Sequence, residues 1–258
     1  PHNDAARRVA QYRLSLDEPF CLRFARAIVE AKLRAHAGLL AERRDSEPQS
    51  RYLLTVCLRR LATSIAAVDE QASIASLRGL EGAGAAAYFE GFADLLPERL
   101  KFSGRNRRPP RDPVNALLSL GYTLLHAEAV LALYGAGLDP FIGFYHALDF
   151  GRESLACDLV EPLRVEVDRH ALMLFRSEKL RPEDFSTTAS GCLLGKAGRA
   201  RFYGEWEPLA ARLRKLLAES VADVAGAIMQ AGGVDAPCSP VGDDTAVEEP
   251  GTEADDGC

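Results

Sequence analysis

The stretch Gly143–Arg164 reads GFYHALDFGRESLACDLVEPLR, and it places a histidine ahead of two carboxylates inside an apolar frame. Asp158 and Glu161 stand three residues apart, so a helix would present both of them on one face. Pro162 has no N–H, so a continuing helix loses the bond to the carbonyl of Asp158 and is expected to bend there. Such a bend would aim the two acids and His146 at a common point.

Two interpretations of this stretch are open from its residues alone. Carboxylates buried in an apolar frame cost several kcal/mol unless a positive charge lies between them, so a divalent cation would account for the pattern. Alternatively, the histidine is an ordinary packed side chain and the Asp-x-x-Glu pair lies on a solvated helix face, since perturbed acids only sometimes mark function. The rest of the chain has to decide between them.

The composition favours packed helices. Of the 258 residues, 47% are apolar but only 7% are aromatic, which suits helix packing better than a β sandwich. We expect residues 1–17 to be an interdomain linker, residues 18–232 a helical domain, and residues 233–258 a disordered acidic tail. Because the chain opens on Pro1 and both methionines come late, we also expect it to be the C-terminal part of a longer protein.

The formal net charge of −6 is concentrated in the tail, so it does not argue against a nucleic-acid partner. Residues 234–258 contain eight acidic residues and no lysine or arginine, which leaves the rest of the chain slightly basic at +2. None of the six cysteines forms a Cys-x-x-Cys pair, so we expect reduced thiols in the cytoplasm and neither zinc nor an iron–sulfur cluster. No uninterrupted apolar run approaches the roughly 18 residues of a membrane span, so no membrane association is expected.

An acid followed by proline marks two helix starts. Asp17-Glu18-Pro19 opens a helix expected to run to about Leu40, and Asp112-Pro113 opens a long apolar helix. The first helix interleaves basic with apolar residues, which indicates either a solvated basic face or a face that tracks phosphates. The second carries Asn115 and Tyr122 two turns apart, and in so apolar a helix both should find polar partners.

Less regular segments are expected in three places. Residues 42–49 should form a charged loop, and residues 187–204 should form a short hairpin or a mobile loop. The final helix is then expected to begin at Pro208 and to end near Gln230.

The stretch Ser76–Phe89 has three glycines and four alanines around one acid, Glu81. Each glycine costs a helix about 1 kcal/mol relative to alanine, so small residues here indicate that another backbone or a ligand comes close. Glu81 is therefore either a metal-binding carboxylate on a rigid helix or a residue at the edge of a tight helix crossing.

Residues 101–111 form a loop that is too rich in proline to be helical. Such a basic loop is either simply solvated or, beside a metal site, a salt-sensitive clamp on phosphates that ignores base sequence. Its five basic residues are Lys101, Arg105, Arg107, Arg108 and Arg111.

Four of these stretches, taken in order, resemble the CRISPR-associated spacer-acquisition integrase, the metal-dependent endonuclease of CRISPR adaptation. They are LRGLEGAGAAAYF around Glu81, NRRPPRDPVNALLSLGYTLL from Asn106, GLDPFIGFYH ending at His146, and DLVEPLR from Asp158. The resemblance extends over about residues 11–219, and four motifs in order are far more specific than any one of them alone.

The resemblance implies an all-α, multi-helix catalytic domain that follows an N-terminal β domain, and this chain matches only the linker and the helical domain. It implies that Glu81, His146 and Glu161 bind the catalytic metal. Asp158 matches a further acid beside them, which orients a ligand or a metal-bound water and occasionally binds the metal itself. Two carboxylates and an imidazole suit Mg²⁺ or Mn²⁺. The residues that would hold DNA phosphates are Arg105, Arg107, Arg108 and Arg111, with part of the basic face of the first helix.

The implied activity is insertion of short DNA spacers into a CRISPR array by attack of 3′-hydroxyl groups, with reversal and hydrolysis of branched DNA at the same site. The implied partners are double-stranded and branched DNA, a second copy of the chain, a small CRISPR adaptation protein, and a fused or bound RecB-like nuclease, all in a prokaryotic cytoplasm. Two departures limit the match. The β domain, which would form much of the dimer and partner contacts, is not matched, and the chain lacks the iron–sulfur cysteines of a fused RecB-like nuclease.

The competing hypothesis is a catalytically inactive helical DNA-binding or scaffold module, in which the acids and the histidine serve packing alone. Thermal stabilisation by a metal ion would separate the two hypotheses. A His–Asp phosphohydrolase is disfavoured, because the sequence has no adjacent His-Asp pair with further histidines around it.

Overall fold

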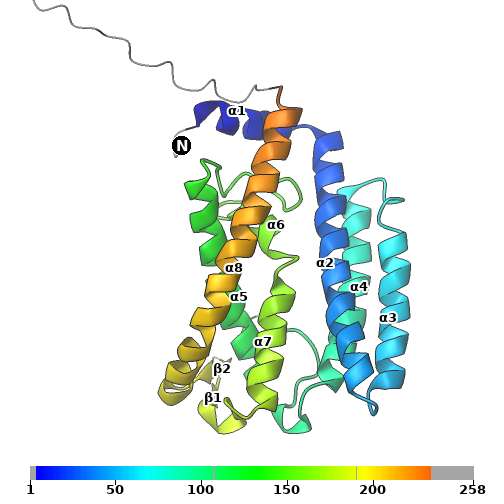
Figure 1. Cartoon of the computed structure of the whole chain (residues 1–258), viewed down its shortest axis with the longest axis vertical. Coiled ribbons are helices and arrows are strands. Elements are labelled where there is room, and N and C mark those ends of the chain that lie inside the picture. Colours follow the sequence, from blue (N-terminus) through cyan, green and yellow to red (C-terminus); the bar gives the residue numbers. More distant parts are fainter. Residues whose placement is uncertain (1–3, 107, 190, 234–258) are drawn as a thin grey trace, which may run out of the picture.

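The computed structural model describes residues 4–106, 108–189 and 191–233, which form two groups of long helices with a short helix across one end (Figure 1). The elements are α1 (Ala5–Leu14), α2 (Glu18–Ser46), α3 (Arg51–Ala66), α4 (Ile74–Asp94), η1 (Glu98–Leu100), α5 (Pro113–Gly135), α6 (Ser154–Val160), α7 (Arg164–Arg176), η2 (Pro182–Asp184), β1 (Phe185–Thr188), β2 (Gly191–Leu194) and α8 (Lys196–Ala231).

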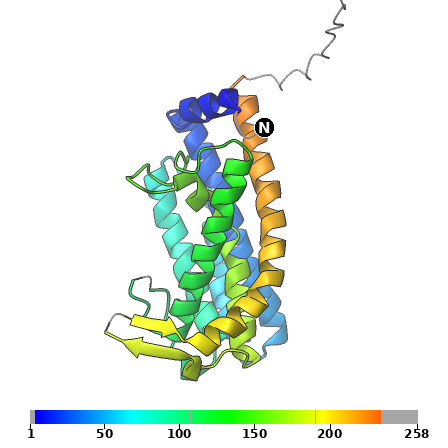
Figure 2. The same ribbon diagram turned by 90° about the vertical axis from the view of Figure 1, so that its left-hand side faces the viewer.

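Helices α2, α3 and α4 pack against one another as the first group, and α5 packs against α6, α7 and α8 in the second. The groups meet where α2 contacts α7, and the candidate site lies at this junction. The antiparallel hairpin β1–β2 packs on α5 at the end of the molecule opposite α1 (Figure 2). Within the described ranges this hairpin is the whole of the β structure, so the all-α prediction is confirmed.

Both predicted helix starts are confirmed by their caps. The Asp17 carboxylate accepts from the Phe20 N–H at 2.8 Å, and the Asp112 carboxylate accepts from the Asn115 N–H at 2.8 Å. The charged loop expected over residues 42–49 is wrong for most of its length, because α2 continues to Ser46. Glutamate and the two arginines at the start of this segment are strong helix formers, so the helix persists until just before the proline at 48.

Helix α5 is long and apolar enough to cross a membrane by length and composition alone. In the fold it is a central helix, with α6, α7 and α8 packed on it, and it buries Leu118, Leu125 and Leu133 completely. Asn115 and Tyr122 have the polar partners that the sequence led us to expect. The Asn115 amide donates to the Gly104 carbonyl at 2.9 Å, and the Tyr122 hydroxyl donates to Asp168.

The start predicted for the last helix is wrong. Residues 185–194 do form a hairpin, but α8 begins at Lys196 and contains Pro208 in its interior. The early turns bury Phe202 and Trp206 at helical spacing. That burial offsets the one hydrogen bond to the Gly204 carbonyl that Pro208 cannot make.

The segment expected to be a linker contains helix α1, which is bound to the turn that follows α5. The Gln11 amide is fully buried, donates to the carbonyls of Asp139 and Ile142 at 2.8 and 2.7 Å, and accepts from the Asp139 N–H at 2.9 Å. Arg7 and Arg8 donate to the carbonyls at 136 and 137. The acidic tail predicted over residues 233–258 lies outside the described residues, apart from Gly233.

Candidate active site

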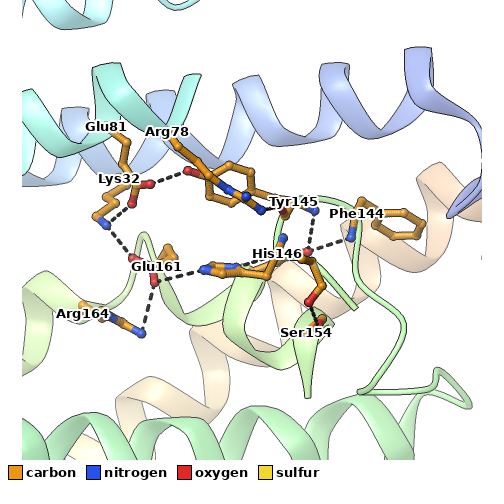
Figure 3. A network of polar contacts seen from close by, with 11 residues as sticks. Lys32, Arg78, Glu81, Phe144, Tyr145, His146, Ser154, Glu161 and Arg164 are labelled. Atoms are coloured by element: carbon orange, nitrogen blue, oxygen red, sulfur yellow. Dashed lines mark hydrogen bonds and ion pairs between the residues drawn. The ribbon is translucent and has the colours of Figure 1, made fainter. Parts of the chain in front are cut away.

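Glu81, His146 and Glu161 lie far apart in sequence and meet at one place in the fold (Figure 3). Glu81 comes from α4, His146 from the loop between α5 and α6, and Glu161 from the point where α6 ends ahead of Pro162. Both glutamates contact the ammonium group of Lys32, and the His146 Nε2 lies 4.0 Å from a Glu161 oxygen. The structure therefore brings the predicted triad together.

Asp158 is fully buried one turn before Glu161, and four hydrogen bonds from the preceding loop end on it. Its Oδ2 accepts from the N–H groups of Phe144 and Tyr145 at 2.8 and 3.1 Å. Its Oδ1 accepts from the N–H of His146 at 2.9 Å and from the His146 Nδ1 at 2.7 Å. Asp158 thus fixes both the backbone and the ring of the loop that carries the histidine.

Gly143 allows this loop to lie directly on α6. A Cβ at this position would fall 2.7 Å from the Ser154 carbonyl carbon and 2.8 Å from both the Leu155 nitrogen and the Asp158 Oδ2. The same loop also satisfies the start of the helix, because the Pro140 carbonyl accepts from the Leu155 N–H at 2.8 Å. A side chain at residue 143 would break this contact.

The contact with Asp158 also sets the chemistry of the His146 ring. A carboxylate can only accept, so the Nδ1 of His146 carries the proton. In the neutral ring the Nε2 then has a free lone pair, and it faces Glu161. A carboxylate behind the ring is the usual means by which proteins orient a metal-binding histidine.

Lys32, on α2, contributes the positive charge at the centre of the site. Its Nζ bonds the Glu161 Oε2 at 2.6 Å and also bonds the Glu81 carboxylate (Figure 3). The side chain is 11% exposed, so these ion pairs are largely shielded from water. Two glutamates, one on each helix group, are thereby joined through one cation.

The pKa of Glu161 reflects these neighbours. Burial would raise the pKa of this carboxyl, but Lys32 and Arg164 outweigh it and lower the value to about 2. Arg164, at the start of α7, lies 3.1 Å from the Glu161 Oε1. Glu161 is therefore ionised throughout the physiological range, as a metal ligand must be.

Glu81 has an open side as well as bonded ones. The Tyr145 hydroxyl donates to its carboxylate, and Arg78 donates to the Tyr145 carbonyl at 2.9 Å. Of the nearby glycines, Gly82 has nothing within 4 Å of an added Cβ, whereas a Cβ on Gly84 would overlap Leu33 of α2. Gly84 therefore serves the tight helix crossing predicted for this stretch, while the metal-binding interpretation of Glu81 stays a prediction.

The donor set fits a hard divalent cation, although the side chains do not enclose one as they stand. Across residues 4–106, 108–189 and 191–233, no three His, Cys, Asp or Glu side chains are grouped closely enough to hold a metal ion. Two carboxylates and an imidazole are nevertheless suitable ligands for Mg²⁺ or Mn²⁺, with water or phosphate completing the shell. The residues that would hold the ion are Glu81, His146 and Glu161, and at present the Lys32 ammonium supplies positive charge between the two glutamates.

A cavity of about 630 Å³ adjoins Lys32 and is lined by three cationic side chains, Lys32, Arg105 and Arg164. Arg105 and Arg164 lie over the ring of Tyr122, with guanidinium carbons 5.3 and 5.0 Å from its centre. His36 also lines the cavity, but burial and the charge of Lys32 lower its pKa to about 3, so it is neutral. The cavity thus has the character of a phosphate-binding pocket next to the candidate metal site.

Beneath these arginines lies a buried network that holds Tyr122 in place. The hydroxyls of Tyr122 and Tyr88 both donate to Asp168, which is fully buried on α7. Burial raises the pKa of Asp168 to about 6, although the two tyrosine hydroxyls act in the opposite direction. The network positions the ring on which Arg105 and Arg164 rest.

The structure treats the four predicted DNA-binding arginines differently. Arg105 lines the cavity, where it donates to Asn115 at 2.8 Å and to Ser119 at 3.0 Å. Arg108 and Arg111 are exposed on the same loop, and Arg107 lies outside the described residues. The basic face predicted on α2 is also divided, because Lys32 points inward while Arg34 pairs with Glu30 at the surface.

Sequence reasoning missed several residues of the site. Lys32 was visible only as one of several interleaved basic residues, and no pattern distinguished its inward direction. Arg164 follows Glu161 by three residues, which is a helical spacing that could have suggested the ion pair. The roles of Tyr145 and Asp168 had no local signal, because their partners are 64 and 46 or more residues away.

Comparisons with known proteins agree with this architecture. The family model described as CRISPR associated protein Cas1 matches residues 1–208. A CRISPR-associated endonuclease Cas1 from Thermodesulfovibrio yellowstonii is 43% identical over 209 residues, which are 80% of this chain and 65% of that protein. A CRISPR-associated exonuclease Cas4/endonuclease Cas1 fusion from Geobacter sulfurreducens is 37% identical over 213 residues, or 80% of this chain and 38% of the fusion.

Among solved structures, a chain of a partial Cas6-RT-Cas1–Cas2 complex superposes with a TM-score of 0.80 and 28% sequence identity. The superposition covers 88% of this chain and 71% of that one. The chain spans less than two thirds of the length of the two relatives described above.

Proposed function

The chain belongs to the Cas1 family of CRISPR-associated proteins, and from that membership we propose that it is the catalytic part of a metal-dependent DNA endonuclease and integrase. The proposed reaction is insertion of short DNA duplexes into a CRISPR array, and hydrolysis of branched DNA is a simpler reaction of the same site. The observation that carries the proposal is the meeting of Glu81, His146 and Glu161, from three separate elements, with the two glutamates joined through one largely shielded positive charge.

Each residue of the site has a proposed role. Glu81, His146 and Glu161 hold Mg²⁺ or Mn²⁺, and Asp158 holds the His146 ring with its Nε2 lone pair directed at the ion. Arg105 and Arg164 line the adjoining cavity and bind phosphates of the DNA backbone. The exposed Arg108 and Arg111, with Arg107 between Asn106 and Arg108 in the sequence, are proposed to extend this phosphate contact.

The bond changes proposed for integration are a transesterification. The 3′-hydroxyl oxygen of the incoming strand forms a bond to phosphorus in the array and loses its proton to solvent. The bond from that phosphorus to the 3′-oxygen of the array strand breaks, and this oxygen leaves as a new 3′-hydroxyl. A bound divalent cation supplies positive charge that offsets the charge developing on the phosphate. Arg164 and Arg105 add fixed positive charge on the cavity side of the site.

The proposed partners follow the names of the relatives. We propose a small Cas2 protein as a partner, because a structural relative belongs to a Cas1–Cas2 complex, and association with a Cas4 exonuclease, because a relative is a Cas4/Cas1 fusion. We further propose that the protein acts as a homodimer on double-stranded and branched DNA, in a prokaryotic cytoplasm. The two sequence relatives described above extend beyond the part that this chain matches.

Cleavage of a branched DNA duplex in Mn²⁺ tests the proposal. The parent chain should cleave the branch strand, while Glu81→Ala, His146→Ala and Glu161→Ala should each lose at least about a hundredfold in rate, because loss even of a group that only orients a metal ligand costs about 10–100-fold. Circular dichroism and thermal melting establish that each variant is folded. Glu219→Ala, which removes an exposed acid of α8, is the matched control and should keep the parent rate.

The outcomes separate the enzyme from the competing scaffold. Activity retained in Glu81→Ala or His146→Ala would refute the metal-site assignment. No cleavage by the parent, combined with no thermal stabilisation by Mn²⁺, would instead support a DNA-binding module in which Lys32 is a permanent structural partner of the glutamates.

A further inference from the structure

Lys32 occupies an unusual position for a lysine near a candidate metal site. Its ammonium bonds Glu161 at 2.6 Å and also bonds Glu81, so it lies between two of the three proposed ligands (Figure 3). The side chain is only 11% exposed and comes from α2, whereas the two carboxylates come from α4 and the end of α6. Removal of this charge without replacement would leave two carboxylates facing each other with little water between them.

An ammonium ion and a divalent cation cannot share this position. Mg²⁺ binds carboxylate oxygens at about 2.0–2.1 Å. The Lys32 Nζ lies 2.6 Å from the Glu161 Oε2 and also bonds Glu81, so it occupies the space in which an ion held by both glutamates would lie. An ammonium group and a divalent cation that contact the same two carboxylates would lie close together, and their positive charges repel strongly in a partly buried site. Metal binding by Glu81 and Glu161 therefore requires the ammonium to leave.

The structure provides one adjoining place for the displaced charge. The cavity of about 630 Å³ is lined by Lys32 itself and by Arg105 and Arg164, with small residues at 85, 86 and 104 in its walls. Its one acid, Glu90, is paired with Arg60. A lysine that turned into this cavity would be a third cation beside two arginines, which is a suitable environment only when an anion such as a phosphate is present.

We propose that Lys32 is a displaceable counter-ion that neutralises Glu81 and Glu161 while no metal is bound, and that it binds a DNA phosphate in the adjoining cavity once a divalent cation has replaced it. This inference rests on the proposed function, since it takes the two glutamates as metal ligands. The displacement would couple metal binding to DNA binding, because the metal ion releases a side chain that then binds DNA.

The affinity for Mn²⁺ without DNA is the first test, measured by calorimetry on the parent, Lys32→Met and Lys32→Gln. The variants should bind Mn²⁺ about tenfold to hundredfold more tightly, because no charged hydrogen bond has to be broken first. Lys32→Gln is included because its amide can still donate to one carboxylate if Lys32→Met fails to fold. Arg34→Met removes a positive charge from the exposed face of the same helix, and its Mn²⁺ affinity should equal that of the parent.

The second test measures DNA affinity against salt concentration in the presence of Mn²⁺. Loss of one phosphate contact in Lys32→Met should reduce the slope of log affinity against log salt by about one. The rate at which Lys32 is acetylated tests the displacement in the parent protein, without any substitution. Acetylation of Lys32 by acetic anhydride should accelerate when Mg²⁺ is added, while that of the exposed Lys215 should not change.

The outcomes of these experiments are distinct. Mn²⁺ binding by the parent with equal or weaker binding by both Lys32 variants would overturn the displacement and leave the proposed function intact. An unchanged salt slope in Lys32→Met would overturn the phosphate contact. No Mn²⁺ binding by either parent or variants would overturn the proposed metal site and this inference with it.

Discussion

Asp158 and Glu161 are buried acids one helical turn apart, but their surroundings differ in kind. Three backbone N–H groups and the ring of His146 surround Asp158, and all four come from one loop. The partners of Glu161 are the long side chains of Lys32 and Arg164, from two other helices. Backbone donors cannot leave without unfolding the loop, whereas side-chain cations can rotate away. Asp158 therefore has a structural role in holding the loop, whereas the partners of Glu161 can be exchanged.

The largest test of this contrast is Asp158→Ala. It leaves three buried N–H groups and an imidazole without their acceptor, so we expect a loss of about 3–5 kcal/mol in the free energy of unfolding. The loss should be the same at low and high salt, because most of the donors are uncharged. Urea denaturation at two salt concentrations measures it, and a loss below about 1 kcal/mol would contradict the structural role.

The effect of Glu161→Gln on the free energy of unfolding should depend on pH. The folded pKa of Glu161 is about 2, below its ordinary value of 4.5, so its ion pairs stabilise the metal-free protein by about 3 kcal/mol above pH 4.5. That contribution is lost as pH falls through about 2. Parent and Glu161→Gln should therefore differ most near neutral pH and converge in acid. A stability difference independent of pH would contradict the assignment.

A third buried acid, Asp168, sharpens the comparison because its direct partners are the neutral hydroxyls of Tyr88 and Tyr122. Its pKa is raised by burial from 3.8 to about 6, so its stabilising contribution is complete below pH 3.8 and is lost as pH rises through about 6. The stability of the parent relative to Asp168→Asn should fall by about 2–3 kcal/mol between pH 4 and pH 7. Thermal melting of both proteins across this range measures the effect, and parallel pH curves would refute it.

The smallest expected effect concerns the loop rather than an acid. Gly143→Ala places a methyl group against backbone atoms of α6, so we expect a loss of about 1–3 kcal/mol and a displaced His146. Gly82→Ala is the matched control, because an added Cβ there meets nothing within 4 Å and alanine favours the helix by up to about 1 kcal/mol. Equal stability changes in the two variants would show that the loop does not press on α6.

The parts of the fold that were predictable depended on local signals. Asp17 and Asp112 start helices because their side chains cap the following turn, and neighbouring residues are enough to reveal that. Pro208 misled the prediction because its fit inside α8 depends on burial of Phe202 and Trp206 against distant residues. The core helices were thus readable from the sequence, while the exact start of α8 required the tertiary packing.

The same distinction holds in the site. Glu81, His146 and Glu161 were identified through the resemblance to a known family, and the structure brings them together. Their metal-binding role stays a prediction. Lys32 could not be assigned, because the direction of a basic residue on α2 depends on how the two helix groups meet. Tyr145 was hidden for the same reason, since its partner Glu81 lies on α4, 64 residues away in the sequence.

Helix α1 and the loop that carries His146 are one mechanical unit. The Gln11 amide donates to the carbonyls of Asp139 and Ile142 and accepts from the Asp139 N–H. The turn formed by these residues continues directly into Gly143. A displacement of α1 would therefore shift the turn at 139–142 and, through it, the loop that carries His146. The position of the imidazole thus depends in part on a helix that makes no contact with the site itself.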